Sequence, residues 1–104
     1  MSGIKNKQLD HEPHTVTITD GAARVSTRDG VDHRATQSAN TTYTIDCDDG
    51  EKMLLVISVE TASTITFEGA AIVSGELDET AGATNILVFY GLGQSVKGWV
   101  LAQE

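Results

Sequence analysis

Apolar and polar residues alternate along most of the chain after residue 13, with the period of two that is typical of β-strands. The clearest runs are 14–19, 42–47 and 64–67. Turn signals that contain glycine separate the runs, and helical periodicity is nearly absent. The pattern predicts seven or eight short strands, and therefore a single all-β domain with the architecture of an antiparallel β-sandwich or a jelly roll.

Two of the turn signals predict hairpins. Asp20-Gly21 lies between 14–19 and 22–27, and Asp49-Gly50 lies between 42–47 and 52–60. Before the first strand, residues 1–13 have no periodicity and end in the only proline of the chain. We therefore expect an extended N-terminal arm or disordered tail at 1–13 and a β-sandwich domain at 14–104.

Two strands, Met53–Ile57 and Ile86–Tyr90, are apolar on both faces. In a sandwich, one face of a strand meets the core and the other normally meets water, so something must cover the second face. Either the arm or loops of the same chain cover it, or it contacts another subunit or a lattice. Under the second interpretation, the candidate interface residues are Lys5, Lys7, Leu54, Val56, Leu87, Phe89 and Trp99.

The formal net charge of −8 is unevenly distributed. Residues 1–34 balance five basic side chains with five acidic ones, whereas residues 35–104 hold only Lys52 and Lys97 against ten acids. This distribution argues against nucleic-acid binding, because phosphate neutralisation needs clustered Lys and Arg. It would allow the neutral arm of one subunit to lie on the acidic body of another, although an acidic surface that only maintains solubility is the alternative.

No apolar run approaches the length that crosses a membrane, and the start of the chain is polar. We therefore expect no membrane partner and synthesis in a cytoplasm.

The candidate metal motifs are incomplete. Asp46–Glu51 resembles a calcium loop, but Gly50 takes the fifth place instead of the sixth, and Ile57 takes the place of the glutamate. A zinc site is also incomplete, because the only imidazoles and the only thiol of the chain are His11, His14, His33 and Cys47. We expect no metal and no cofactor.

The chain also lacks a recognisable catalytic constellation. No Gly-x-Ser-x-Gly elbow occurs, and we expect the histidines to lie outside the body of the domain. Cys47 lies on the apolar side of its strand, which predicts an inert core thiol. Glu76, Asp78 and Glu79 cluster near a loop, but no aromatic platform accompanies them. These observations predict that the protein is not an enzyme.

Several segments between residues 40 and 101 consist of residues that favour strands or tight turns. They are Asn40–Ile45, the turn Asp49-Gly50 before an apolar strand, Thr64–Phe67, Ile86–Gly91 and Gly98–Val100. In these segments the chain resembles small virion structural proteins of tailed phages. Such proteins fold as β-sandwiches or jelly rolls and serve as decoration, head-fibre or tail-accessory parts. The resemblance implies no catalytic residues.

Capsid decoration fits the expected arm and the two-faced strands best. The resemblance implies that the partner is the major capsid protein or another virion protein, that the chain forms a homotrimer, and that it lies on the capsid surface of a virion. Two other classes stay open. One is a tail or fibre module that binds a host glycan through exposed Trp99 or Tyr90, and the other is a monomeric cellular β-sandwich adaptor.

Overall fold

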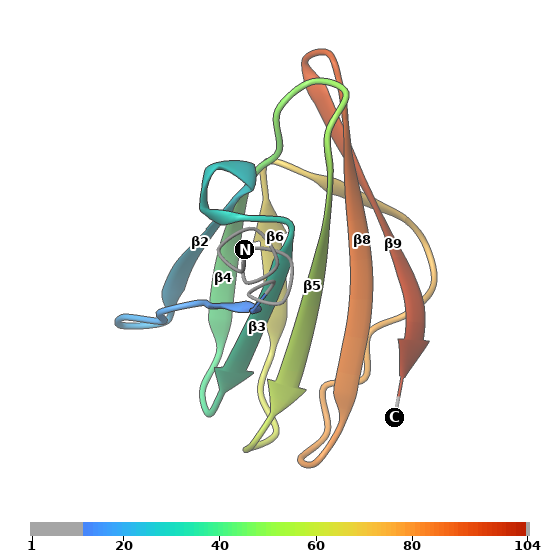
Figure 1. Ribbon diagram of the computed structural model, residues 1–104. Helices are drawn as coiled ribbons and strands as arrows, with labels where there is room; N and C mark the ends of the chain where they lie inside the picture. The colour runs from blue at the N-terminus through green and yellow to red at the C-terminus, as the bar shows by residue number, and fades with distance from the viewer. Residues whose placement is uncertain (1–11, 104) are drawn as a thin grey trace, which may run out of the picture.

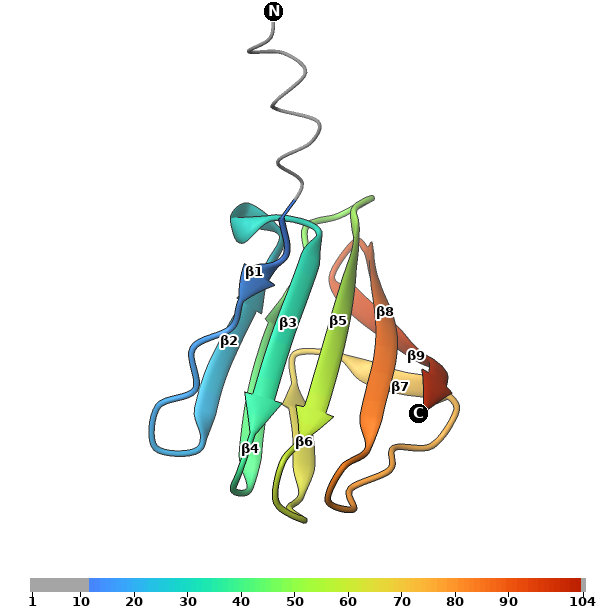
Figure 2. The same ribbon diagram turned by 60° about the horizontal axis from the view of Figure 1, so that its bottom comes forward.

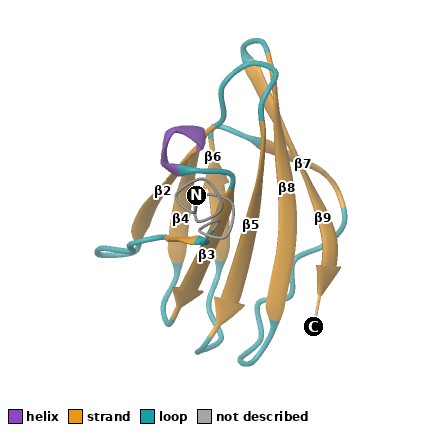
Figure 3. Ribbon diagram, in the orientation of Figure 1, coloured by secondary structure: helices purple, strands orange, loops and turns teal. Residues whose placement is uncertain are grey.

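The computed structural model describes residues 12–103, and the regular secondary structure of these residues is almost all β-strand (Figures 1 and 3). The six-stranded sheet has the order β1 (His14–Thr15), β3 (Asp32–Gln37), β5 (Lys52–Val59), β8 (Thr84–Leu92), β9 (Ser95–Gln103) and β7 (Ala71–Ser74). The three-stranded sheet has the order β2 (Ala22–Ser26), β4 (Thr41–Asp46) and β6 (Ile65–Glu68). A single 3-10 turn, Thr27–Asp29, follows β2. The prediction of an all-β chain is confirmed.

The first six strands alternate between the two sheets. β1, β3 and β5 lie in the six-stranded sheet, whereas β2, β4 and β6 form the three-stranded sheet (Figure 2). Neighbouring strands within each set run parallel, as in the pairing of His14 with His33 and of Ala22 with Thr42. Residues 14–68 are therefore wound like a short solenoid.

Both predicted hairpins are wrong, although the turns themselves form. Thr19 N–H donates to the Ala22 carbonyl at 2.9 Å and Ala22 N–H donates to the Thr19 carbonyl at 3.0 Å, which closes a tight turn at Asp20-Gly21. The strands on either side of this turn then join different sheets, and so do β4 and β5 on either side of Gly50. Antiparallel pairing between the strands is found only for β5–β8 and β8–β9 within the described residues. A tight turn reverses the chain locally without deciding which strands pair.

The expected N-terminal arm at 1–13 lies almost wholly outside the described residues, and it stays a prediction.

The core fills the space between the two sheets. Alternate residues of β2, β4, β5 and β8 form one buried cluster, in which Val25, Leu55, Ile57, Leu87 and Phe89 have no exposed surface. Three aromatic rings pack in a row. The Tyr43 and Phe67 centroids, within the three-stranded sheet, are 5.8 Å apart, and the Phe67 and Phe89 centroids, which connect the two sheets, are 5.5 Å apart. The core therefore uses two of the few aromatic residues as its contacts across the layers.

One polar network is enclosed within this core. Tyr43 Oη donates to Gln37 Oε1 at 2.8 Å, and Gln37 Nε2 donates to Ser63 Oγ at 2.8 Å and to the Thr64 carbonyl at 3.3 Å. Burial raises the pKa of the Tyr43 phenol far above its ordinary value, so the phenol remains a donor. The network ties β3 and β4 to the segment that leads into β6.

Gly98 positions the β8–β9 hairpin on the core. A Cβ at Gly98 would lie 2.6 Å from Phe89 Cε1 and 2.8 Å from Ile72 Cδ1. Only a residue without a side chain allows the Phe89 ring to lie against β9 at this point. Because side chains alternate along a strand, Trp99 is directed to the opposite, outward side of the sheet.

Candidate functional site

The outer face of the six-stranded sheet is the side turned away from the three-stranded sheet (Figures 1 and 2). Strand register arranges its side chains in rows that cross β3, β5, β8 and β9. Two central rows are Asp32, Leu54, Val88, Trp99 and Arg34, Val56, Ile86, Ala102. On one side of them lies the row Lys52, Tyr90, Lys97, and on the other side lies the row Thr36, Ser58, Thr84.

We call the six large apolar or aromatic side chains of these rows the outer patch: Leu54, Val56, Ile86, Val88, Tyr90 and Trp99. All six are half-buried, and none belongs to the core cluster. No described segment lies in front of β5 and β8 in Figures 1 and 2. Beside the patch, Leu101 is 59% exposed at the register irregularity of β9. Large contiguous apolar surfaces are uncommon on proteins that have no binding partner, so the outer patch is the candidate contact site.

The outer face is also the basic side of an acidic domain. It carries Arg34, Lys52 and Lys97, with Asp32 as the only acid within the strand bounds. The rest of the described chain has two arginines against twelve acids. Arg34 and Asp32 pair within the chain, with Arg34 Nε donating to Asp32 Oδ1 at 3.0 Å. The patch therefore combines an apolar centre with a rim of net positive charge.

The structure brings three of the predicted interface residues together. Leu54 and Trp99 both flank Val88 in one row, and Val56 lies in the next row. Lys5 and Lys7 lie outside the described residues.

The prediction that Leu87 and Phe89 belong to the interface is corrected by the structure. Both have no exposed surface and belong to the core. Leu55 pairs with Leu87, whereas Leu54 pairs with Val88, so Leu54 and Leu87 point to opposite faces of the sheet. The outward residues of β8 are Ile86, Val88 and Tyr90.

Sequence reasoning missed Ile86 and Val88, and named Tyr90 only as a candidate for glycan binding, because β8 is apolar on both faces. The polar residue of the strand, Asn85, would normally indicate the outward face, yet it has no exposed surface. Its amide is satisfied inside the protein: Asn85 Nδ2 donates to the Asp78 carbonyl at 2.9 Å, and Asp78 N–H donates to Asn85 Oδ1 at 2.8 Å. The two lysines that end the outer face, Lys52 and Lys97, were a usable signal, because a charged side chain points outward.

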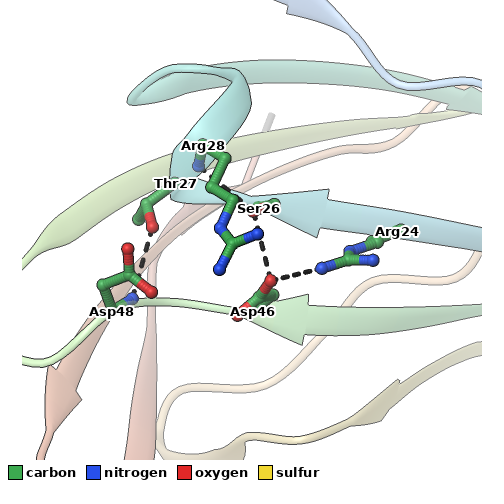
Figure 4. A network of polar contacts seen from close by, with 6 residues as sticks. All are labelled: Arg24, Ser26, Thr27, Arg28, Asp46 and Asp48. Atoms are coloured by element: carbon green, nitrogen blue, oxygen red, sulfur yellow. Dashed lines mark hydrogen bonds and ion pairs between the residues drawn. The ribbon is translucent and has the colours of Figure 1, made fainter.

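A second polar cluster lies at the ends of β2 and β4 (Figure 4). Arg24 Nη2 donates to Asp46 Oδ2 at 2.5 Å, Ser26 Oγ donates to the same oxygen at 3.3 Å, and Arg28 N–H donates to Ser26 Oγ at 3.1 Å. The Arg24 guanidinium is the main cause that holds the pKa of Asp46 below its usual range. Because the Arg24 side chain is 64% exposed, this ion pair contributes little to stability.

The Asp46–Glu51 segment that resembles a calcium loop is a turn. Glu51 N–H donates to the Asp48 carbonyl at 3.0 Å, and Asp48 N–H donates to Thr27 Oγ1 at 3.3 Å. Among residues 12–103, no group of three or more His, Cys, Asp or Glu side chains is placed to hold a metal ion.

Two histidines form a pair across β1 and β3. His14 Nδ1 and His33 Nδ1 are 3.2 Å apart, and His33 Nε2 donates to the Gly30 carbonyl at 2.9 Å. With its Nε2 protonated, neutral His33 accepts a hydrogen bond from His14 at Nδ1. Burial is the main cause that lowers the pKa of His33. The pair therefore joins two strands through the neutral form of His33.

Cys47 lies in the core, where its Sγ donates to the Glu51 carbonyl at 3.2 Å. Burial raises the pKa of this thiol, which disfavours the nucleophilic thiolate.

A shallow hollow of about 180 Å³ is lined by Gly75, Glu76 and residues 100–103. Glu76 is the one charged side chain among the described lining residues, and none of these residues is a serine, cysteine, histidine or lysine. In the described part of the chain, no helix has the length and apolar character to cross a membrane.

Comparison of the chain with protein-family models, curated proteins and solved structures found no match.

Proposed function

We propose that this protein is a non-enzymatic structural part that works by assembly into a larger particle. The observation that carries the proposal is the outer patch, a contiguous apolar surface that no described segment of the chain covers. An apolar surface of this kind stabilises a protein when another surface removes it from water. In this reading, the domain presents the patch to a partner and performs no chemistry.

In its specific form, the proposal is a capsid decoration protein on the outer shell of a tailed phage. This form depends on the resemblance that residues 40–101 bear to small virion proteins. It is supported by the fact that the segments carrying the resemblance include the strands β4, β6, β8 and β9. We also propose that the two packed sheets class the domain as a β-sandwich, with a solenoid-like winding in place of a jelly roll.

The test is binding to shells that lack the protein. Mature shells of the phage that encodes this chain, produced without it, are mixed with purified protein and recovered by sedimentation. We expect saturable binding with a fixed number of copies for each shell. Shells that already carry the protein are the matched control and should bind none. Failure to bind the empty positions of the mature shell would contradict the decoration proposal.

A second candidate function is glycan binding by a tail or fibre accessory. It is favoured by the position of Tyr90 and Trp99, which lie in neighbouring rows of the same outer face. Aromatic side chains on one face can stack against sugar rings. Trp99 is the only tryptophan of the chain, so its fluorescence reports on this face alone. A saturable fluorescence change on titration with host glycans would support this candidate, and an unchanged spectrum would remove it.

A further inference from the structure

The rows of the outer face are complementary to themselves. We infer that the outer patch of one copy of the chain packs against the outer patch of a second copy, about a two-fold axis that lies in the plane of the face and crosses the strands. This inference goes beyond the proposed function, because it names the occupant of the patch and holds for any assembly of which the protein is a part.

The apolar rows match under this rotation. A two-fold axis across the strands exchanges the two central rows and leaves each strand above its own copy. The row Leu54, Val88, Trp99 then lies opposite Val56, Ile86 and Ala102 of the second copy. Each apolar side chain of the central rows therefore meets another apolar side chain, and the isologous contact is made twice.

The charged groups at the edge of the face match as well. Asp32 and Arg34 occupy the same edge strand in the two exchanged rows. The rotation places Asp32 opposite Arg34 of the second copy, and Arg34 opposite its Asp32. The existing ion pair, with its 3.0 Å contact, becomes an alternating ring of four charges. Opposite charges across an interface favour the correct partner and orientation.

The lysine row meets a neutral row in this arrangement. Lys52 and Lys97 lie at one end of the face, and Ser58 and Thr84 lie at the other end. The rotation places Lys52 of each copy over Ser58 of the other, and Tyr90 over Thr84. By contrast, a two-fold axis parallel to the strands would place each row over its own copy. The two lysine rows would then share one end of the contact, and this accumulation of like charge is unfavourable. Sheets that pack face to face keep their strands within about 30° of alignment, which preserves the matching of rows.

The size of the face predicts a weak, reversible dimer. Four strands at a spacing of about 4.8 Å, with about seven residues each at about 3.3 Å, give a face of roughly 400 Å². Two copies would bury about 800 Å², which is below the ~1,200–2,000 Å² of stable protein–protein interfaces. We therefore expect a dimer with a Kd of about 1–100 μM, and a monomer at nanomolar concentrations.

The charge pair allows a direct test. The variants Asp32→Arg and Arg34→Asp each place like charges opposite one another across the two-fold axis. We expect each variant alone to associate at least about tenfold more weakly than the wild type. An equimolar mixture should form a heterodimer, because all the charges of one variant then face opposite charges of the other. Native mass spectrometry separates the two homodimers from the heterodimer by mass.

The wild-type concentration series and the mixture decide the inference together. A wild-type dimer and an enriched heterodimer would support it, and circular dichroism would verify that each variant is folded. If a variant does not fold, the neutral pair of variants Asp32→Asn and Arg34→Gln replaces it, and each should weaken the dimer without unfolding the domain. A wild type that stays monomeric at about 1 mM, a trimer, or a mixture without heterodimer would overturn the inference.

Discussion

The buried hydrogen bond between Tyr43 and Gln37 should contribute measurably to the stability of the domain. The substitution Tyr43→Phe removes one hydroxyl group from a ring that has no exposed surface, and it leaves the packing of the ring with Phe67 intact. Gln37 is 1% exposed, and the Tyr43 hydroxyl is the hydrogen-bond donor to its Oε1 among the described residues. The substitution therefore leaves a buried carbonyl oxygen without a partner.

The expected magnitude follows from that unpaired oxygen. Leaving a buried acceptor unsatisfied costs about 1–3 kcal/mol of unfolding free energy. For a domain of about 100 residues, each kcal/mol lowers the Tm by about 4–8 °C. We therefore expect a decrease of roughly 5–20 °C, measured by thermal and urea unfolding.

Two comparisons make this reasoning refutable. Tyr90→Phe makes the same chemical change on the outer face, where no hydrogen bond from Tyr90 to a described residue is found, and should change the stability by less than about 0.5 kcal/mol. The double substitution Tyr43→Phe with Gln37→Leu removes both partners and should cost about 1–2 kcal/mol less than the sum of the two single changes. Equal losses for the two tyrosine variants, or strictly additive changes in the cycle, would refute the account of the network.

Three other predictions concern single sites. The pKa of His33 lies below its ordinary 6.5 in the folded state, so the unfolded chain binds a proton more readily. The unfolding free energy should therefore fall as pH decreases below about 6.5. Urea unfolding at pH 5 and pH 7 measures this, and His33→Gln should reduce the dependence of the unfolding free energy on pH. A Cβ at Gly91 would lie 2.1 Å from the Asp48 carbonyl oxygen, so Gly91→Ala should destabilise the domain by about 2–4 kcal/mol. The clashes at Gly98 are with side-chain atoms, which can move. A smaller loss of stability for Gly91→Ala than for Gly98→Ala would contradict this prediction. Burial of Cys47 predicts that a thiol reagent modifies it only as fast as the domain opens, and immediate modification of the native protein would show that the thiol is accessible.

The existence of the strands could be predicted from the sequence, but their pairing could not. Strict alternation revealed β4, because Tyr43 and Ile45 are buried while Thr44 between them is exposed. Parallel pairing leaves no comparable local signal, because its partners are distant along the chain. His14 pairs with His33, Asp32 with Leu54, and Thr41 with Ile65, at spacings that are all different. Because the successive turns of the solenoid differ in length, no repeat is visible in the sequence. The local turn signals favoured hairpins that do not form.

The candidate site was predicted in part for a related reason. A strand that is apolar on both faces indicates an additional contact, and this led to Leu54 and Val56 as candidate interface residues. The structure places both of them, and the predicted Trp99 of β9, on the outer face. The same feature hides which alternate residues of the strand face the core. The prediction therefore places Leu87 and Phe89 on the surface, although they are core residues. Only the register between β5 and β8 decides which set of residues points outward.

Sedimentation equilibrium of the wild type and of Val88→Asp tests most directly the claim that the outer patch is an assembly surface. Val88 lies at the centre of the patch, between Leu54 and Trp99. Thr66→Asp is the matched control, because it adds the same charge to an exposed strand position of the three-stranded sheet. We predict that the wild type and the control dimerise at tens of micromolar and that Val88→Asp is a folded monomer, since a charge buried in an apolar contact is strongly disfavoured. A wild type that stays monomeric at about 1 mM, or a Val88→Asp variant that associates as the wild type does, would contradict the account.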